Sequence, residues 1–367
     1  MSTASAPVRI GRGTSVRELL RPLEPYFAMA DVTEVVVNRP GEVLYEQGAT
    51  WVRDELPDLP YDRLFALVKA IATFTDQSIG PQSPILSAIL PDGQRVQIMV
   101  PPAVPVDTVS LSIRLPAQSI RSLADYTADG AFARFIWPAP VGLADRRGDL
   151  QQQDLALVDA LLARNLQDFF RRAVAGRRNI AVVGDTGSGK TTLMKTLCQH
   201  IPEEERILTI EDVRELQLPG HHNVVPLLYS KGGQGVAQIT PADLIAAAMR
   251  MRPDRVLLAE LRGSEAWDFL KLLTTGHSGS ITSYHAESCA LALERYVLMA
   301  KEHPDASIFD AAGLKRLVRL TIDILVHVRA EVGADGVKRR FVDEIYFDPI
   351  AKLRERFEER ELVRGDA

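Results

Sequence analysis

The sequence has few cysteines and no long apolar run. Only Cys198 and Cys289 occur among 367 residues, so a disulfide framework and a four-cysteine zinc site are both excluded. Nowhere do about 18 apolar residues follow one another, as a membrane-spanning helix requires. The first residues also lack the apolar segment of a signal peptide. We therefore expect a cytoplasmic protein, for which peripheral attachment to a membrane complex remains open.

An excess of positive charge is also absent. The chain carries 43 Lys and Arg against 48 Asp and Glu, a formal charge of −5, and it has no basic tail. This balance argues against a protein whose main affinity comes from neutralising a nucleic-acid backbone. The composition, 46% hydrophobic and 25% charged, is that of a globular protein, and the length predicts roughly two domains.

Residues 1–135 read as a compact α+β domain without the alternation of a parallel sheet. Apolar spacing predicts helices over 16–28 and 61–77, and short β-rich runs lie between them. A hairpin is expected around Pro91-Asp92-Gly93, because Asp-Gly is a strong turn signal. A further strand is expected over 109–116.

The composition changes after this domain, becoming rich in Pro, Gly and polar residues between 137 and 153. We therefore place a linker at 136–165, with a helical run over 155–174 leading out of it. Over residues 166–350, strand and helix patterns alternate, which predicts an α/β domain with a parallel central sheet. Thr240, Pro241 and Asp243 mark one helix start, and a hairpin is expected around 333–336. Residues 351–367 form a charged tail.

A phosphate-binding loop follows the apolar run at 180–183. The segment GDTGSGKT, with a helical pattern after it, matches G-x-x-x-x-G-K-[ST]. Such a loop closes backbone N–H groups around phosphate oxygens, and the helix start favours negative charge. Lys190 should reach the β- and γ-phosphates of ATP, and the Thr191 hydroxyl should ligate Mg²⁺. The nucleotide-binding residues predicted here are Gly184, Asp185, Thr186, Gly187, Ser188, Gly189, Lys190, Thr191 and Thr192.

Two glutamates end apolar strand patterns and could complete an ATPase site. Glu211 closes RILTIED together with Asp212, and Glu260 closes RVLLAE. Carboxylates at the C-terminal edge of a parallel sheet commonly hold the metal or orient the attacking water. Glu260 is expected near Mg²⁺, directly or through a water, while either glutamate could position the attacking water. Both could instead be helix caps or surface charges.

Four blocks in a fixed order carry a family resemblance: GDTGSGKTT, ILTIEDVREL, MRMRPDRVLLAELRGSEAWDFL and TTGHSGSITSYHAES. Together they resemble the hexameric secretion ATPases of type IV secretion and conjugation, type II secretion and type IV pili. The segment AILPDGQRVQIMVPPAV, followed by LSIRLP, is similar to the N-terminal domain of the type IV secretion traffic ATPases, the TrwD-like branch. Type II secretion ATPases usually carry a tetracysteine zinc element, which two cysteines cannot supply.

The resemblance implies a RecA-like ATPase domain and a six-membered ring that couples Mg²⁺-dependent ATP hydrolysis to secretion. Within the ring, Arg95 and Arg114 of the N-terminal domain would approach the phosphates, with Arg121 as a weaker candidate. Other implied catalytic residues are Lys190, Glu211, Glu260 and His285, the last sensing the γ-phosphate, whereas His277 would hold local structure. The implied partners are other copies of the chain, other ATPases and inner-membrane components, with nucleic acid only as a cargo.

Other functions stay open at this point. A type IV pilus or type II secretion motor would share the chemistry and differ in its partner complex. A nucleotide-gated scaffold would bind ATP in order to assemble and would hydrolyse little of it. A DNA-translocating helicase is disfavoured by the acidic balance and by the lack of an aromatic and basic stripe.

Overall fold

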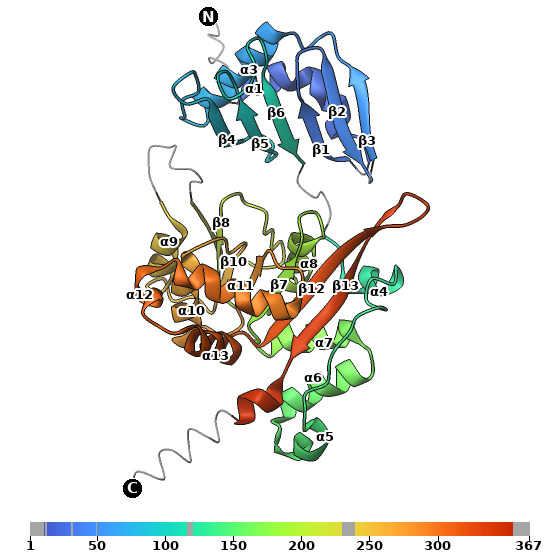
Figure 1. Cartoon of the computed structure of the whole chain (residues 1–367), viewed down its shortest axis with the longest axis vertical. Helices are drawn as coiled ribbons and strands as arrows, with labels where there is room; N and C mark the ends of the chain where they lie inside the picture. Colours follow the sequence, from blue (N-terminus) through green and yellow to red (C-terminus); the bar gives the residue numbers. More distant parts are fainter. Residues whose placement is uncertain are drawn as a thin grey trace, which may run out of the picture. The chain divides into compact units, whose positions relative to one another are not determined.

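A computed structural model describes residues 11, 13–30, 32–48, 50–115, 120–229 and 239–354. The chain forms two compact units, one built mainly from residues 1–118 and the other from 119–229, 239–333 and 338–367 (Figure 1). No helix within the described ranges combines the length and the apolar character that crossing a membrane would require.

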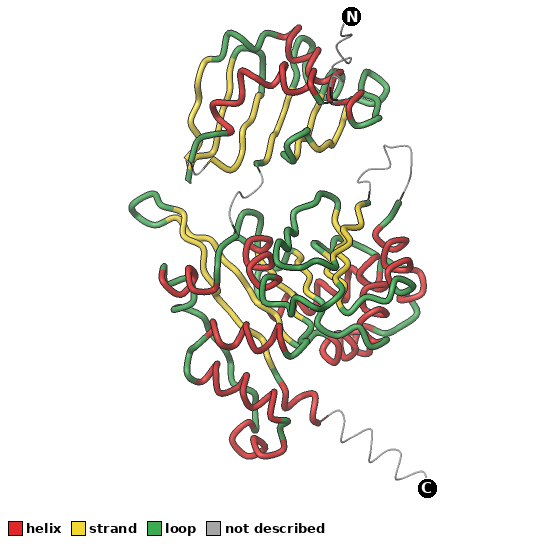
Figure 2. The backbone as a smooth tube through the Cα atoms, turned by 180° about the vertical axis from the view of Figure 1, so that it is seen from behind, coloured by secondary structure: helices red, strands yellow, loops and turns green. Residues whose placement is uncertain are grey.

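The first unit is a six-stranded antiparallel sheet with helices on one face (Figure 2). Its strand order is β3-β2-β1-β6-β5-β4, and the hairpin expected at Asp92-Gly93 joins β4 to β5. The apolar side chains predicted on the second helix are buried in a single core. The elements are α1 (Thr14–Leu20), η1 (Arg21–Leu23), α2 (Glu24–Phe27), β1 (Val32–Val37), β2 (Glu42–Gln47), β3 (Thr50–Glu55), α3 (Tyr61–Phe74), β4 (Ile85–Ile89), β5 (Arg95–Met99) and β6 (Ser110–Arg114).

The helix expected over 16–28 is not continuous. It is divided into α1, η1 and α2, with a proline near the start of both η1 and α2. Pro22 and Pro25 have no amide hydrogen to donate, and a proline ring is tolerated best in the first turn of a helix. The helical pattern was therefore right, but the two prolines restart the helix twice.

The second unit is a seven-stranded sheet, mostly parallel, with helices on both faces. The order is β13-β12-β7-β11-β10-β8-β9, in which only β13 is antiparallel to its neighbour. The first half of the unit contains α4 (Leu123–Ala128), α5 (Leu143–Arg146), η2 (Arg147–Asp149), α6 (Gln152–Leu162), α7 (Leu166–Ala175), β7 (Ile180–Gly184), α8 (Lys190–Cys198), β8 (Ile207–Glu211) and β9 (Val224–Leu228). The second half contains α9 (Pro241–Ala248), β10 (Arg255–Leu258), α10 (Glu265–Thr274), β11 (Ile281–Tyr284), α11 (Cys289–Lys301), α12 (Pro304–Ser307), α13 (Ala311–Thr321), β12 (Ile324–Val332) and β13 (Lys338–Phe347).

Two apolar cores sandwich this sheet because successive strand residues point to opposite faces. Along β7, Ile180 and Val182 enter the core shared with α6, α7 and α8, whereas Ala181 and Val183 enter the core shared with α9, α10 and α11. All five residues of β7 are buried. The predicted α/β class with a mainly parallel sheet is thus confirmed, and so is the hairpin that joins β12 to β13.

The linker expected at 136–165 was wrong, because the structure places these residues in the second unit. Leu143, Leu157 and Leu161 are buried in its core, and the Ile136 N–H donates to the Asp343 carbonyl at 2.8 Å. The unit begins near residue 119, well before the predicted boundary at 166. Arg164, at φ 54°, separates α6 from α7 where one helix was expected. The charged tail lies outside the described residues from 355 onward.

Candidate nucleotide-binding site

The glycine-rich loop leaves the sheet at the end of β7 and enters α8 at Lys190, as the sequence predicts. Gly184 has φ +152°, and a Cβ there would lie 2.2 Å from the Val328 carbonyl oxygen of β12. Gly189 has φ +100°, and a Cβ there would lie 3.2 Å from the Arg340 side chain. Only glycine allows this close path between strand and helix. The amides in the first turn of α8 have no partner within the helix, and a helix start of this kind suits phosphate.

Lys190 is almost completely buried in this loop. Its Nζ donates to the carbonyl oxygens of Gly184, at 3.0 Å, and Asp185, at 2.9 Å. It also lies 3.3 Å from Nδ1 of His285, the residue that follows β11. Burial and the Lys190 ammonium lower the pKa of His285, which favours the neutral imidazole. Lys190 and His285, predicted from separate motifs, therefore meet at one edge of the sheet.

Glu260 lies next to His285 at this edge. Its Oε1 is 3.1 Å from His285 Nε2, and its Oε2 accepts a hydrogen bond from Arg262 Nε at 2.8 Å. The Glu260 side chain is 22% exposed. Arg262 also lies 3.2 Å from Asp212. Burial would lower the pKa of Arg262, but the charges of Glu260 and Asp212 outweigh it and raise that pKa.

Glu211, the last residue of β8, is in a different environment. It is fully buried, and its carboxylate accepts hydrogen bonds from the Thr209 hydroxyl and from the amides of Glu215 and Leu216, each at 2.8 Å. Burial raises the pKa of Glu211, and these donors oppose the rise. The carboxylate therefore ties the turn after β8 to the strand end.

The predicted arginines fall in two different units. Arg95 on β5 and Arg114 on β6 are cross-strand partners in the first unit. Arg121, expected with them, belongs instead to the second unit. There it forms an ion pair with Asp129, and its guanidinium lies 4.1 Å from the centre of the Tyr126 ring. Arg121 was wrongly grouped with the N-terminal arginines because the second unit begins earlier than its composition suggested.

Two cations on β13 were missed by the sequence analysis. Arg340 Nε donates to the Gly187 carbonyl at 3.0 Å, and Lys338 Nζ would lie 3.5 Å from a Cβ at Gly187. They reach the loop because the β12–β13 hairpin continues beyond the last pairing with β7 at Val328. Three consecutive basic residues in the strand segment KRRF were the only signal for this arrangement. Arg262 was also missed, although it lies two residues after Glu260.

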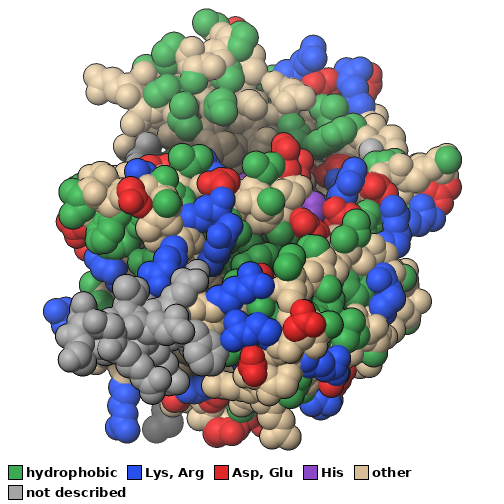
Figure 3. Space-filling view, turned by 60° about the horizontal axis from the view of Figure 1, so that its bottom comes forward, with side chains coloured by type: hydrophobic (Ala, Val, Ile, Leu, Met, Phe, Trp, Pro, Cys, Tyr) green, Lys and Arg blue, Asp and Glu red, His purple; other side chains and the backbone are tan. Residues whose placement is uncertain are grey.

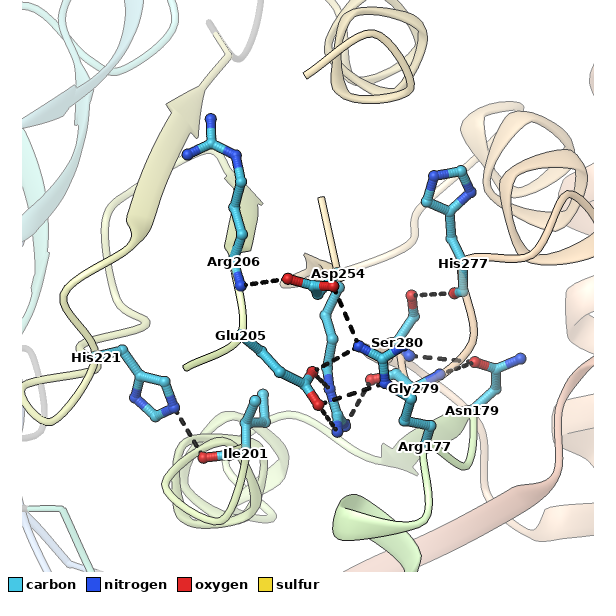
Figure 4. A network of polar contacts seen from close by, with 11 residues as sticks. Arg177, Asn179, Ile201, Glu205, Arg206, His221, Asp254, His277, Gly279 and Ser280 are labelled. Carbon is cyan, nitrogen blue, oxygen red and sulfur yellow. Dashed lines mark hydrogen bonds and ion pairs between the residues drawn. The ribbon is translucent and has the colours of Figure 1, made fainter. Parts of the chain in front are cut away.

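His277 lies at the opposite edge of the sheet from His285. It precedes β11, whose first residue pairs with Ile180 at the start of β7, whereas His285 follows the end of β11. Figure 4 shows the His277 carbonyl accepting a hydrogen bond from Ser280, beside a polar network that includes Asn179. That His277 holds local structure stays a prediction.

The residues present suit a hard divalent cation in the manner of P-loop proteins. The Thr191 hydroxyl at the start of α8 and the Glu260 carboxylate supply the oxygen donors that Mg²⁺ prefers, and the phosphates of a nucleotide would supply the others. Within the described part of the chain, no group of three or more Asp, Glu, His or Cys residues forms a metal cage.

A buried parallel strand, a glycine loop and a helix beginning at the loop lysine define a P-loop nucleotide-binding protein. The family model "Type II/IV secretion system protein" matches residues 146–331. The type IV secretion system protein VirB11 of Brucella suis is 44% identical over 345 residues, which are 94% of this chain and 93% of the relative. PtlH of Bordetella pertussis is 44% identical over 338 residues, 92% and 96% of the two chains.

The solved structures agree with these relatives. The crystal structure of the VirB11 ATPase from the Brucella suis type IV secretion system, in complex with sulphate, has a TM-score of 0.51 at 42% identity and covers 92% of this chain and 99% of that one. The pilus retraction motor PilT, with a TM-score of 0.57 at 15% identity over 95% of this chain and 89% of its own, shares the fold. This chain belongs to the type II/IV secretion ATPase family. It is an ATPase, as the four sequence blocks predicted.

Proposed function

We propose that the chain is a hexameric, Mg²⁺-dependent motor with a RecA-like ATPase unit that powers type IV secretion. The support is that VirB11 and PtlH, each named as a type IV secretion system protein, are 44% identical to this chain over more than nine tenths of it. The motor would work in the cytoplasm, attached peripherally to the inner membrane. Its partners would be other copies of the chain, other ATPases and inner-membrane components of the secretion complex.

The observation that carries the catalytic part is the contact chain Lys190–His285–Glu260 at the edge where the P-loop lies. Lys190 and the amides from Gly184 to Thr192 hold the phosphates, and Thr191 and Glu260 face the metal. His285 lies against both Lys190 and Glu260, so it can respond when a γ-phosphate moves Lys190. Positioning and charge stabilisation of this kind supply most of the catalysis in phosphoryl transfer.

Glu260 is the better candidate for orienting the attacking water. Its carboxylate is partly exposed and contacts only side chains, whereas the Glu211 carboxylate is fully buried and accepts hydrogen bonds from two backbone amides. A carboxylate that orients water needs an oxygen within reach of that water. Glu211 therefore shapes the turn that carries Asp212, and Glu260 does the chemistry.

Arg95 and Arg114 are proposed as the phosphate clamp. They lie directly opposite each other on β5 and β6, so their side chains leave the same face of the sheet. Two like charges in this position repel unless an anion or an acid lies between them. A guanidinium pair suits the charge of a triphosphate, and loss of the γ-phosphate would weaken its hold.

Secretion of protein and transfer of DNA are both open as the work performed. On the face that Figure 3 shows, basic side chains are interspersed with acidic ones. With a net charge of −5, this supports nucleic acid as a transient cargo and not as a tightly held ligand. Hydrolysis could equally serve assembly of the secretion complex.

The test is steady-state ATP hydrolysis by purified Lys190→Ala. We expect turnover to fall by about 10²-fold or more, because a preorganised charge on the phosphates is lost. Lys271→Ala is the matched control, since Lys271 pairs with Asp268 on α10 outside the site. Normal turnover by Lys190→Ala would falsify the assignment.

A second measurement separates a motor from a scaffold. Ring formation and phosphate release are followed together, with and without Glu260→Gln. A motor loses phosphate release and keeps nucleotide-dependent assembly, while a scaffold assembles and releases negligible phosphate even as wild type. Pull-down with inner-membrane components of type IV secretion, type II secretion and pilus machines identifies the partner complex.

A further inference from the structure

Arg262 lies between two acids that belong to neighbouring strands. Glu260 follows β10, and Asp212 follows β8, its parallel neighbour in the sheet. The Arg262 backbone N–H donates to Glu265 Oε1 at 2.6 Å, at the start of α10. The backbone is thus anchored while the long side chain can rotate. From one fixed backbone position, the guanidinium can therefore reach either carboxylate.

In the structure, the guanidinium is mainly on Glu260. Both Nε and Nη2 of Arg262 donate to the same oxygen, Glu260 Oε2, and the other oxygen faces His285. Each Glu260 oxygen therefore already has a protein partner. Any cation or water that needs this carboxylate must compete with a guanidinium held in direct contact.

Asp212 offers the guanidinium a second position. Its Oδ2 lies 3.2 Å from Arg262 Nη2, so a small rotation moves the charge from one acid to the other. Nη1 of Arg262 is buried and has no hydrogen-bond partner among the described residues. An incompletely satisfied buried donor favours a side chain with an alternative arrangement nearby. Asp212 is the acid placed to receive it.

We propose that Arg262 is a positioning residue that occupies Glu260 in the nucleotide-free protein and moves to Asp212 when a metal–nucleotide complex binds. This proposal rests on the proposed function, because it takes Glu260 to be the acid that faces the metal. The exchange keeps Glu260 neutralised without nucleotide, so a lone divalent cation finds little net negative charge. It also makes Glu260 available only when nucleotide and cation arrive together.

The test measures the affinity of the full-length protein for the fluorescent nucleotide mant-ADP, with Mg²⁺ and with EDTA. The ratio of the two dissociation constants reports how strongly the cation favours nucleotide binding. Arg262→Gln removes the competing charge, so we expect this ratio to rise by about fivefold or more. Turnover of ATP should fall in the same variant, because Glu260 loses its orientation. A merely structural role would weaken binding and turnover together and leave the ratio unchanged.

Asp212→Asn is nearly isosteric and should change the ratio in the opposite direction to Arg262→Gln. It removes the second partner and leaves Arg262 on Glu260, so the ratio should fall below that of the wild type. Arg262→Lys keeps a positive charge beside Glu260, so the ratio should return to within about twofold of the wild-type value. In the double variant Arg262→Gln/Glu260→Gln, the gain should disappear, since the two residues act on one ion. Arg172→Gln, which breaks an exposed pair with Asp168 on α7, is the control.

The outcomes distinguish failure of the proposed Arg262 exchange from failure of the proposed nucleotide site. Suppose that the wild type binds and hydrolyses ATP but Arg262→Gln leaves the ratio of the two dissociation constants unchanged or lower. The proposed Arg262 exchange is then wrong, and the site assignment stands. The proposed exchange is equally wrong if Asp212→Asn raises the ratio. If wild type fails to bind mant-ADP and hydrolyses nothing, the proposed function itself has failed.

Discussion

The two edges of the parallel sheet carry similar polar residues. These residues differ in how completely their hydrogen bonds are made within the protein. At the edge where the strands begin, Glu205 accepts hydrogen bonds from the fully buried Arg255 at 2.6 and 3.2 Å, and Arg255 also donates to the Gly279 carbonyl. Asn179 accepts hydrogen bonds there from the Gly279 and Ser280 amides (Figure 4), and it also donates to the Thr321 carbonyl. At the edge where the strands end, Arg262 is shared between two acids and the His285 side chain is 49% exposed.

The difference shows why a cluster of Arg, Glu and His does not by itself mark a site. The network around Arg255 has its partners within the protein, so it joins the beginnings of β7, β8, β10 and β11. The series of contacts from Arg262 through Glu260 and His285 to Lys190 is made by side chains that a ligand can draw away from one another. Catalysis is expected where polar groups are held in place but can exchange a protein partner for a ligand.

The largest effect should follow from breaking the buried edge. Arg255→Gln leaves Glu205 without its main partner inside the protein, so the free energy of unfolding should fall by about 3–5 kcal/mol. Urea denaturation measures this. Arg177→Gln is the matched control, because Arg177 contacts the same Glu205 from a side chain that is 42% exposed, and its loss should cost less than about 1 kcal/mol. Equal losses in the two variants would contradict the contrast between the edges.

The two strand-end glutamates offer a sharper comparison within the catalytic edge. Glu211→Ala leaves two amides and a hydroxyl without their acceptor, so unfolding should become easier by about 2–3 kcal/mol. Glu260→Ala should cost about 1 kcal/mol or less, because its carboxylate is partly exposed, yet it should abolish hydrolysis. Urea denaturation and phosphate release on both variants test this.

The pH dependence of stability adds a check on Glu211. Its pKa is raised in the folded protein by burial. Its favourable contribution to stability is therefore complete below its unfolded pKa and is lost as the pH rises through the folded value. Relative to Glu211→Gln, the wild type should become less stable between acidic and neutral pH. A wild type that gains stability over this range, relative to the variant, would mean that the three donors outweigh burial.

The sequence predicted what is local and missed what depends on strand ends meeting. The loop from Gly184 to Thr191 could be found because all its parts are contiguous in the chain. Glu260 and His285 could be found because motifs of the family carry them. The pairing of Arg262 with Asp212 depends on β8 lying next to β10, and the contact of Arg340 with Gly187 depends on a hairpin that outgrows its neighbour. No spacing within the sequence encodes either.

The errors in the fold have physical causes as well. Residues 136–165 were interpreted as a linker because short helices joined by Pro and Gly expose polar faces, although their leucines enter the core. No strand was expected at β9, which contains Pro226. This strand is the last in the sheet, where a missing amide hydrogen is tolerated. Such positions read as loops until the sheet order is known.

The smallest effect concerns Arg340, which extends the catalytic edge beyond the sheet itself. Arg340→Gln removes the charge beside Gly187 and the donor to its carbonyl, so the loop loses support and mant-ADP should bind about fivefold more weakly. Arg339→Gln removes the same charge from the next position, whose side chain points to the other face of β13, and binding should stay within about twofold. Fluorescence titration at constant ionic strength measures both. Equal weakening would show that the hairpin acts only through its net charge, whereas a selective loss in Arg340→Gln would add a strand outside the four sequence blocks to the nucleotide site.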